Sequence, residues 1–336
     1  MKKYKIASFD FATPDIYDVI RKQFPENFEL ITLDADTLED RVEKAKEADF
    51  IIAATGSIPT EAILAAKNLK MIQQQGVGFD KTDVDLATKL GIEVCITPEG
   101  TSIGVSEHVV LLILAVYKKL VMISNQMYEG KFPMWDYRTE CFQIYGKTIG
   151  FYGFGRIARE AAKRLQGFEP KIIFYDKYIN MSEEEQKGLK VTQVSSIDEL
   201  LSQADVVSVH IPSNNETRGS INKDFFNKMK KTAIFINTAR GDLLNEEDFF
   251  DAIENNVIAG AGIDVYPKEP LPPDNRYIKL KNVTLTPHVA AGTIDALKMK
   301  IDHVCANIIR FINGEETLHS LNKDKIKNIR RGEGVK

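Results

Sequence analysis

The sequence predicts an α/β protein built from two doubly wound parallel-sheet domains. Short β-rich runs alternate with helical stretches along the whole 336-residue chain, which is typical of βα units on a parallel sheet. The runs in the second series are almost continuously apolar, as expected for strands that helices cover on both faces. The length also favours two domains, because one domain commonly takes ~100 to 200 residues.

The first series of expected elements occupies the first hundred residues. Five runs are expected to be strands: 4–9, 28–33, 50–54, 71–74 and 92–96. Between these strands, apolar residues recur with helical spacing, so helices are expected, for example at 61–67 and 84–90. Together these segments predict one parallel sheet.

A second sheet is expected after a connecting helix. Apolar positions keep helical spacing over residues 102–128, which predicts one long helix between the domains. Six further strands are then expected: 148–152, 172–175, 206–210, 233–237, 259–264 and 283–286. Past Thr293 a helical pattern runs to Gly314, a typical C-terminal stop, and the basic segment 323–336 is expected to be a solvated tail.

Charge and cysteine content exclude several classes of protein. The chain carries 44 Lys and Arg against 48 Asp and Glu, so it lacks the clustered positive charge that nucleic-acid binding needs. Cys95, Cys141 and Cys305 lie far apart and indicate neither a disulfide framework nor a zinc site, so no metal is expected.

The longest apolar run, 109–116, is far shorter than the ~20 residues that cross a bilayer. With no signal-peptide pattern either, we expect a cytoplasmic protein.

Residues 153–158 read G-x-G-x-x-A between an expected strand and a helical pattern over 156–165. In that context the pattern predicts a dinucleotide site. Gly153 permits the tight turn, Gly155 lets a pyrophosphate approach the backbone, and Ala158 keeps the helix close to the strand. The phosphates are expected at the helix N-terminus, where free N–H groups and the helix dipole favour negative charge.

An acidic residue follows the next expected strand. Asp176 stands 23 residues after Gly153, where a carboxylate accepts hydrogen bonds from ribose hydroxyls and repels a 2′-phosphate. The sequence therefore favours NAD over NADP, although the neighbouring Lys177 weakens that preference.

Three later strand ends carry reactive groups, Arg240, Glu269 and His288. The carboxyl ends of parallel strands converge on the ligand crevice, so these side chains are expected near the nicotinamide. Reduction of a 2-keto acid needs a cation for the carboxylate, a proton donor and a hydride source, which Arg240, His288 and NADH supply in turn. Glu269 is expected to fix the His288 tautomer and stabilise the imidazolium.

Several stretches carry a further signal in combination: GVGFD at 76–80, GKTIG at 146–150, ADVVSVHIP at 204–212, INTARG at 236–241, AGAGIDV at 259–265 and TPH at 286–288. They resemble the D-2-hydroxyacid dehydrogenase family, which includes phosphoglycerate, glycerate and D-lactate dehydrogenases. The resemblance covers about residues 50 to 321.

The resemblance implies specific roles. Arg240, Glu269 and His288 are then the catalytic triad, backbone N–H groups of Val77 and Gly78 hold the substrate carboxylate, and Asp264 contacts the nicotinamide carboxamide. The other implied residues of the NAD site are Arg156, Ile157, Asp176, Ile211, Pro212, Thr217, Thr238 and Ala239. The family topology implies a Rossmann NAD-binding domain (102–289) inserted into a flavodoxin-like substrate domain (1–101 and 290–336), and a homodimer formed through the helix after Ser102 and the arm around Trp135.

The sequence departs from the phosphoglycerate enzymes where they direct two arginines at the substrate phosphate. Here those regions read ATGS at 54–57 and QQQ at 73–75. Because a phosphate needs charged partners to offset its desolvation, we expect a small unphosphorylated acid such as hydroxypyruvate, glyoxylate or pyruvate. Gln74 and Gln75 are alternatively expected to bind a polar substrate tail, or Phe79, Trp135 and Tyr137 to line an apolar pocket.

Other functions stay open at this level. One alternative is a phosphoglycerate dehydrogenase that lacks a regulatory domain. A different class is an NAD(H)-sensing binding protein, since corepressors that resemble the family keep the same triad. Formate dehydrogenases pair the histidine with Gln, so Glu269 counts against that reaction.

Overall fold

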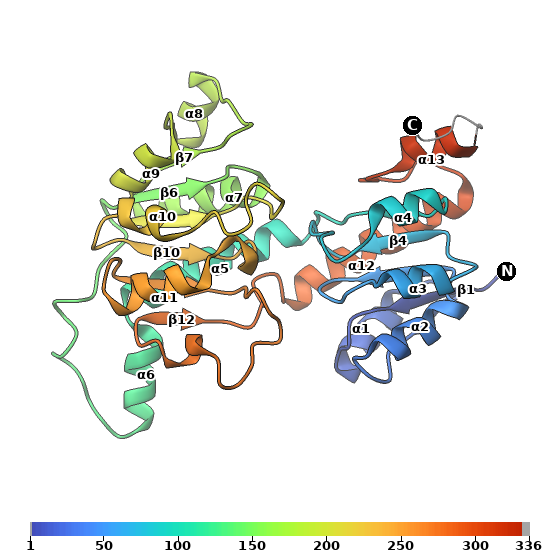
Figure 1. Cartoon of the computed structure of the whole chain (residues 1–336), viewed down its shortest axis with the longest axis horizontal. Helices are drawn as coiled ribbons and strands as arrows, with labels where there is room; N and C mark the ends of the chain where they lie inside the picture. Colours follow the sequence, from blue (N-terminus) through green and yellow to red (C-terminus); the bar gives the residue numbers. More distant parts are fainter. Residues whose placement is uncertain (1, 331–336) are drawn as a thin grey trace. The chain divides into compact units, whose positions relative to one another are not determined.

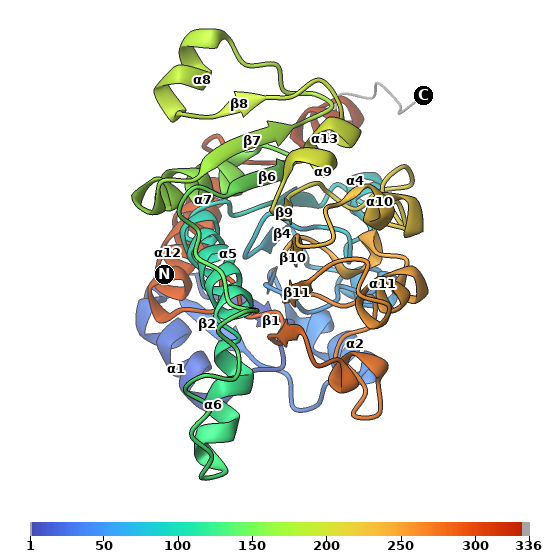
Figure 2. The same ribbon diagram turned by 90° about the vertical axis from the view of Figure 1, so that its left-hand side faces the viewer.

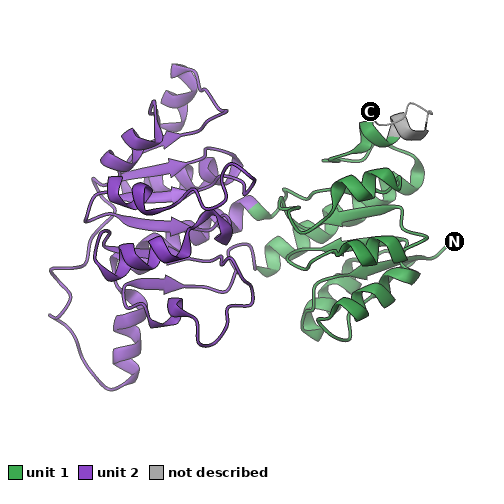
Figure 3. Cartoon of the chain, viewed as in Figure 1, with its two compact units in different colours: residues 1–101, 293–336 green, residues 102–292 purple. Residues whose placement is uncertain are grey.

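The computed structural model describes residues 2–330 (Figure 1). The chain divides into two compact units, shown in Figure 3: unit 1 comprises Met1–Thr101 and Thr293–Lys336, and unit 2 comprises Ser102–Gly292. Each unit contains one parallel β-sheet with helices on both faces, so the predicted α/β fold class is confirmed.

Unit 1 has a five-stranded sheet in the order β2-β1-β3-β4-β5, which is the flavodoxin-like order 2-1-3-4-5. Its strands are β1 (Tyr4–Ser8), β2 (Phe28–Ile31), β3 (Phe50–Ala53), β4 (Met71–Gln74) and β5 (Glu93–Cys95). Its helices are α1 (Pro14–Gln23), α2 (Leu38–Glu47), α3 (Thr60–Ala65), α4 (Val84–Lys89), α12 (Ile294–Asn313) and α13 (Lys323–Arg330).

Alternation along the strands divides the core of unit 1 between the two faces of its sheet. In β3, Phe50 and Ile52 pack against α1 and α12, while Ile51 and Ala53 pack against α2 and α3. All four side chains are buried, which explains why this strand is apolar without interruption.

Unit 2 has a seven-stranded parallel sheet in the order β12-β11-β10-β9-β6-β7-β8. Its strands are β6 (Thr148–Tyr152), β7 (Lys171–Tyr175), β8 (Thr192–Gln193), β9 (Val206–Val209), β10 (Ile234–Asn237), β11 (Gly260–Ile263) and β12 (Val283–Leu285). Its helices are α5 (Thr101–Tyr117), α6 (Leu120–Tyr128), α7 (Arg156–Leu165), α8 (Glu183–Leu189), α9 (Ile197–Gln203), α10 (Lys223–Lys228) and α11 (Glu246–Glu254), with 3₁₀ turns η1 (Gln166–Phe168), η2 (Gly241–Leu243) and η3 (Arg276–Lys279).

The sheet of unit 2 has the topology of a Rossmann fold, seen from the side in Figure 2. The chain builds outwards from β6 through β7 to β8, and then returns to β9 on the other side of β6. Ligands of doubly wound sheets bind at such a switch point, outside the carboxyl ends of the strands. The candidate site is therefore expected at the ends of β6 and β9.

The single helix predicted over residues 102–128 is wrong, because the structure has two helices. Lys119 adopts φ 49°, a left-handed conformation that ends α5 and starts a new helix at Leu120. The N–H of Phe142, from the chain that returns past the helix end, donates to the C=O of Tyr117 at 2.9 Å. A tertiary contact thus replaces the helical hydrogen bond that would have continued α5.

The basic C-terminal segment also differs from its prediction. Residues 323–330 form α13 instead of a solvated tail, and Ile326 of this helix is buried. The rest of the predicted tail, 331–336, lies outside the described residues. Within residues 2–330 we find no helix that has both the length and the apolarity to traverse a bilayer.

Candidate active site

The glycine turn between β6 and α7 has the geometry that a dinucleotide site needs. Gly153 has φ +89°, and a Cβ there would lie 2.7 Å from the carbonyl of His210, so only glycine fits. Gly155 precedes α7, and a Cβ at this position would meet no protein atom within 4 Å. The turn is therefore tight against the protein at Gly153 and open on the ligand side at Gly155.

The start of α7 offers backbone donors beside that open space. Arg156 and Ile157 occupy the first turn, whose N–H groups have no partner within the helix. Arg156 is exposed, and Ala158 is buried against the sheet, as the motif predicts. An anionic group is stabilised at such a helix end by the N–H groups and the dipole together.

Asp176 lies directly after β7 and organises the turn as well as the loop that follows it. Its Oδ2 accepts a hydrogen bond from Phe154 N–H at 2.8 Å, and its Oδ1 accepts from the N–H groups of Tyr178 and Ile179 at 2.8 and 2.9 Å. The carboxylate is thus held beside the glycine turn.

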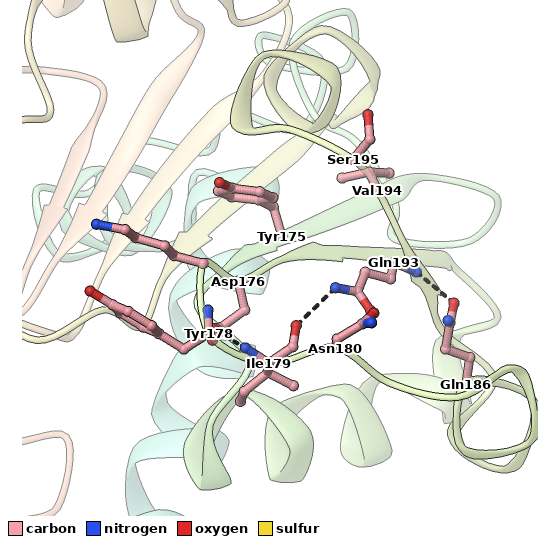
Figure 4. Close-up of a pocket in the computed structure, with 10 residues that line it drawn as sticks. Tyr175, Asp176, Tyr178, Ile179, Asn180, Gln186, Gln193, Val194 and Ser195 are labelled. Carbon is pink, nitrogen blue, oxygen red and sulfur yellow. Dashed lines mark hydrogen bonds between the residues drawn. The ribbon is translucent and has the colours of Figure 1, made fainter.

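Asp176 also lines a cavity of about 550 Å³ (Figure 4). The close-up shows the loop after β7 on one side and residues of α8 and β8 on the other, joined by the Gln193 Nε2 bond to the Ile179 carbonyl at 2.8 Å. The lining residues are Tyr175, Asp176, Lys177, Tyr178, Ile179, Asn180, Gln186, Gln193, Val194 and Ser195.

The loop after β9 carries three further residues that the resemblance implies. Ile211 lies beside the glycine turn, 3.0 Å from the position that a Cβ on Gly153 would take. Thr217 Oγ1 donates to the carbonyl of Pro212 at 2.7 Å, which closes the loop 212–217. Ile211 and Pro212 thus follow the strand that meets β6 at the switch point.

A half-buried histidine lies directly before this loop. His210 contacts Ser208 Oγ through Nε2 at 2.8 Å, and desolvation lowers the pKa of His210 to about 3. The ring is therefore neutral at physiological pH.

Thr238 and Ala239 follow β10 on the same edge of the sheet. The Ala239 N–H donates to Asn237 Oδ1 at 3.0 Å, which shapes the strand end. Thr238 Oγ1 is buried and is without a hydrogen-bond partner among the described residues, so it is available to a ligand. Together with the open space at Gly155 and the first turn of α7, this hydroxyl makes the site fit a dinucleotide.

The loops after β11 and β12 bring the predicted acid–base pair together. His288 Nδ1 lies 2.9 Å from Glu269 Oε2, and the Tyr266 N–H donates to Glu269 Oε1 at 3.1 Å. Both side chains are partly exposed, His288 at 31% and Glu269 at 21%. Glu269 thus fixes Nδ1–H on the imidazole and leaves Nε2 for a substrate.

Asp264 holds the backbone of the histidine loop. The carboxylate is fully buried and accepts hydrogen bonds from Thr286 Oγ1 at 2.7 Å and from the N–H groups of Val289 and Ala290 at 2.9 and 3.0 Å. His288 itself has φ 54°, an uncommon conformation for a non-glycine residue. We infer that Asp264 positions His288, and its contact with the nicotinamide stays a prediction.

His108 is a member of this network that sequence reasoning missed. Its Nε2 lies 2.9 Å from Thr286 Oγ1 and 3.5 Å from Asp264 Oδ1. Burial lowers the pKa of His108, while the Asp264 charge opposes that shift. No sequence pattern indicates this role, because His108 lies in the middle of α5, far along the chain from Thr286 and Asp264.

Arg240 stands at the end of β10, next in the sheet to β11. Asn237 Nδ2 donates to the Arg240 carbonyl at 2.9 Å, which fixes the backbone. A Cβ on Gly241 would lie 1.9 Å from the Tyr266 carbonyl carbon, so this glycine lets the two strand ends approach. Arg240, Glu269 and His288 therefore follow three neighbouring strands, β10, β11 and β12.

The two residues predicted to bind a substrate carboxylate through the backbone, Val77 and Gly78, lie in unit 1, in the loop after β4. Val77 is 38% exposed. Gln73 and Gln74 precede this loop and are buried: Gln73 bonds Thr97 Oγ1 at 2.8 Å, and Gln74 bonds Thr82 Oγ1. The Gln74 amide therefore binds Thr82 within unit 1. One interpretation of the sequence was that this amide binds a polar tail of the substrate.

Asp10 is a second residue that sequence reasoning missed. Its carboxylate accepts hydrogen bonds from three successive backbone N–H groups, those of Ala54, Thr55 and Gly56, at 2.6, 2.9 and 2.8 Å. An acidic side chain thus already occupies the donors of the loop after β3. The pairing joins residues 44 to 46 positions apart, which no local motif reveals.

Comparisons with known proteins agree with this geometry. A model of the D-isomer specific 2-hydroxyacid dehydrogenase NAD-binding domain matches residues 110–290. Glyoxylate reductase of Thermofilum pendens is 38% identical over 301 residues, which cover 89% of this chain and 88% of that protein.

Two other similar proteins extend the comparison. D-3-phosphoglycerate dehydrogenase of Archaeoglobus fulgidus is 36% identical over 85% of this chain, and the match spans only 53% of that longer protein. The structure of NAD-dependent formate dehydrogenase of Staphylococcus aureus in complex with NAD superposes with a TM-score of 0.82 at 28% identity, covering 95% of this chain and 98% of that one. The chain therefore belongs to the D-isomer specific 2-hydroxyacid dehydrogenase family of NAD-dependent oxidoreductases.

Proposed function

We propose that the protein interconverts a small, unphosphorylated 2-keto acid and its D-2-hydroxy acid with NAD(H). The observation that carries this proposal is the 2.9 Å pair of His288 Nδ1 and Glu269 Oε2 at the strand ends of an NAD-binding domain. The similarity to a glyoxylate reductase over nearly the whole length of both chains supports the substrate class.

The residues of unit 2 account for each part of the reaction. Bound NADH supplies the hydride to the substrate carbonyl carbon. His288 Nε2 donates a proton to the carbonyl oxygen, while Glu269 stabilises the imidazolium through Nδ1. Arg240 binds the substrate carboxylate with its planar guanidinium. In the oxidation direction the same His288 Nε2 accepts the hydroxyl proton.

For the cofactor we propose the residues predicted from the sequence. The pyrophosphate lies against Gly155, Arg156 and Ile157, and Asp176 accepts the ribose hydroxyls. Thr238 and Ala239 line the nicotinamide end, with Ile211, Pro212 and Thr217 on the opposite wall. The buried, unsatisfied Thr238 hydroxyl supports this arrangement, because a ligand would complete its hydrogen bonding.

The absence of a phosphate on the substrate is supported by the loop after β3. Its three N–H groups donate to the Asp10 carboxylate, so a phosphate there would meet a negative charge instead of free donors. The backbone N–H groups of Val77 and Gly78 are our candidates for substrate carboxylate binding from unit 1.

We further propose a cytoplasmic homodimer. The three cysteines are free thiols, which suits a reducing compartment. Helix α6 has no buried residue, and the segment after it exposes Phe132 and Trp135 at 71% and 68%. Such a concentration of exposed apolar side chains is typical of an interface.

The test is steady-state turnover of NADH and NADPH with glyoxylate, hydroxypyruvate, pyruvate and 3-phosphohydroxypyruvate. We expect kcat/KM to be highest with NADH and one of the three unphosphorylated acids. A comparable kcat/KM for 3-phosphohydroxypyruvate would instead indicate a phosphoglycerate dehydrogenase. Tight NADH binding without turnover of any acid would indicate an NAD(H)-sensing protein.

A further inference from the structure

Unit 1 contains a cluster of metal-ligand side chains that the proposed reaction does not use. Glu99, His303 and His319 bring one ligand atom each to within 4.8 Å of one another. Glu99 follows β5, His303 belongs to α12, and His319 lies in the segment between α12 and α13. We propose that these three residues form a binding site for a divalent transition-metal ion, with Zn²⁺ as the best match.

Both histidines approach the Glu99 carboxylate, each at a different oxygen, and one ligand atom of each of the three side chains lies within 4.8 Å of the other two. Glu99 Oε1 lies 3.1 Å from His319 Nε2, and Glu99 Oε2 lies 3.1 Å from His303 Nδ1. Tetrahedral zinc with bonds near 2.0–2.1 Å places its ligand atoms roughly 3.3 Å apart. Two imidazoles and one carboxylate form a common ligand set for zinc, with water in the open fourth position.

Hydrogen bonding within the cluster is incomplete, which points to a missing partner. Glu99 Oε2 is buried and has no hydrogen-bond partner among the described residues. The 3.1 Å approach of Glu99 Oε2 to His303 Nδ1 does not satisfy the unpaired oxygen. Buried polar atoms are normally satisfied, so an ion at this position would explain the arrangement.

The cluster is partly buried and partly open to solvent. The His303 side chain is only 10% exposed. Glu99 and His319 are 40% and 30% exposed, so an ion can reach the cluster from solvent.

The surrounding backbone holds the ligands in place independently of any ion. The Ile96 N–H donates to the His319 carbonyl at 3.1 Å, which fixes the strand end that leads to Glu99 against the C-terminal segment. Asn307, one turn after His303, exchanges hydrogen bonds with both backbone groups of Leu318 at 2.7 and 3.1 Å. His319 adopts φ 54° at the point where its ring stacks on His303, with ring centroids 5.6 Å apart.

Zn²⁺ at this position would link three chain segments, at residues 99, 303 and 319. An ion that binds the folded state and not the unfolded chain raises stability by mass action. We therefore expect Zn²⁺ to raise the Tm of the full-length protein. Sequence reasoning expected no metal, because the ligands lie 204 and 16 positions apart and share no spacing motif.

The experiment is a titration of the chelator-treated, full-length protein with ZnCl₂ by isothermal calorimetry, together with Tm measurements. We expect one Zn²⁺ per chain and a higher Tm with the ion. Glu99→Gln and His319→Asn should each weaken binding by at least about tenfold, since losing even an outer partner of a metal ligand has that effect. Asn is chosen because it tolerates the left-handed backbone of His319.

The matched control is Glu315→Gln, an exposed glutamate of the same segment outside the cluster. It should bind Zn²⁺ as the wild type does. Failure of the wild type to bind the ion, or affinity unchanged in both cluster variants, would overturn the proposal. The readouts are affinity and Tm, so this result is independent of whether the protein reduces keto acids.

Discussion

His288 combines the proposed proton-transfer role with an unusual backbone conformation. Its φ of 54° lies in the left-handed region, and its N–H donates to the Asp264 carbonyl at 2.7 Å. Asp264 therefore holds the residue that Glu269 orients, and the imidazole is preorganised before substrate arrives. A substitution at position 288 therefore tests the chemistry alone only if the new residue can adopt the same left-handed backbone conformation.

His288→Asn is the variant that meets that condition, because Asn tolerates the left-handed region. We expect kcat to fall by about 10²- to 10⁴-fold, the usual contribution of a general acid–base group. NADH affinity, measured by fluorescence titration, should stay close to the wild-type value. A parallel loss of NADH binding would count against the assigned role, and the Tm serves as the control for folding.

Arg240→Lys tests the substrate contact. Lysine keeps the charge but cannot present two parallel N–H donors to a carboxylate. We expect KM for the keto acid to rise more than kcat falls, as measured by steady-state kinetics. A variant with an unchanged KM would mean that Arg240 does not bind the carboxylate.

His210 provides a pH-dependent prediction for stability. Its pKa of about 3 in the folded protein lies below the ~6.5 of an unfolded histidine. Below pH 6.5 the unfolded chain binds a proton that the folded protein does not, so His210 lowers the free energy of unfolding as the pH falls towards 3.

The variant for this prediction is His210→Gln, measured by urea denaturation at pH 7.5 and pH 5. The substitution loses packing and the Ser208 contact at both pH values. At pH 5 it should recover up to about 2 kcal/mol relative to wild type, because its side chain does not titrate. An identical loss at both pH values would contradict a neutral His210 in the folded protein.

At the scale of elements, the two glycines in the turn between β6 and α7 are expected to differ in role, one in folding and the other in cofactor binding. A Cβ on Gly153 would meet the His210 carbonyl, whereas a Cβ on Gly155 would enter open space. Two glycines in one motif therefore meet different physical demands. Contacts within the protein require glycine at position 153, whereas at position 155 only the proposed cofactor would do so.

A matched pair of alanine variants tests that separation. Gly153→Ala should lower the Tm strongly, because a left-handed residue and a 2.7 Å clash must both be accommodated. Gly155→Ala should keep a near wild-type Tm and lose NADH affinity in a fluorescence titration, since its methyl group occupies the pyrophosphate position. Equal effects of the two substitutions on Tm would argue against this division.

The sequence predicts an element well when the residues that define it lie close together in the chain. Strand β6 and helix α7 have the predicted bounds, because a glycine turn and a clear apolar period define both. Lys119 ends α5 through a contact from Phe142, and Asp10 finds its donors more than forty residues away. Contacts between residues that lie far apart in the chain cannot be recognised from a local sequence pattern. For that reason the sequence did not predict the helix break or the roles of Asp10 and His108.

At the scale of the whole molecule, the proposed homodimer depends on the surface of α6 and the segment after it. The exposed side chains of α6 include the apolar Leu120, Val121 and Met127, and Tyr128 is 90% exposed. A Phe132→Ser variant should shift sedimentation velocity from dimer towards monomer at low protein concentration. The control is Ile278→Ser, an exposed apolar residue of η3 in the same unit, which should sediment like the wild type.

The packing of α12 determines the order in which the protein can fold during synthesis. Ile301 and Val304 of this helix complete the core on one face of the unit 1 sheet, and Asn322 bonds the backbone of β5 through Val94 N–H at 2.9 Å. These residues follow both the first hundred residues and unit 2 along the chain. During synthesis unit 2 can therefore complete its core while the first hundred residues still lack α12 and expose one apolar face of their sheet. Chaperone contacts on the nascent protein are expected to concentrate on that face.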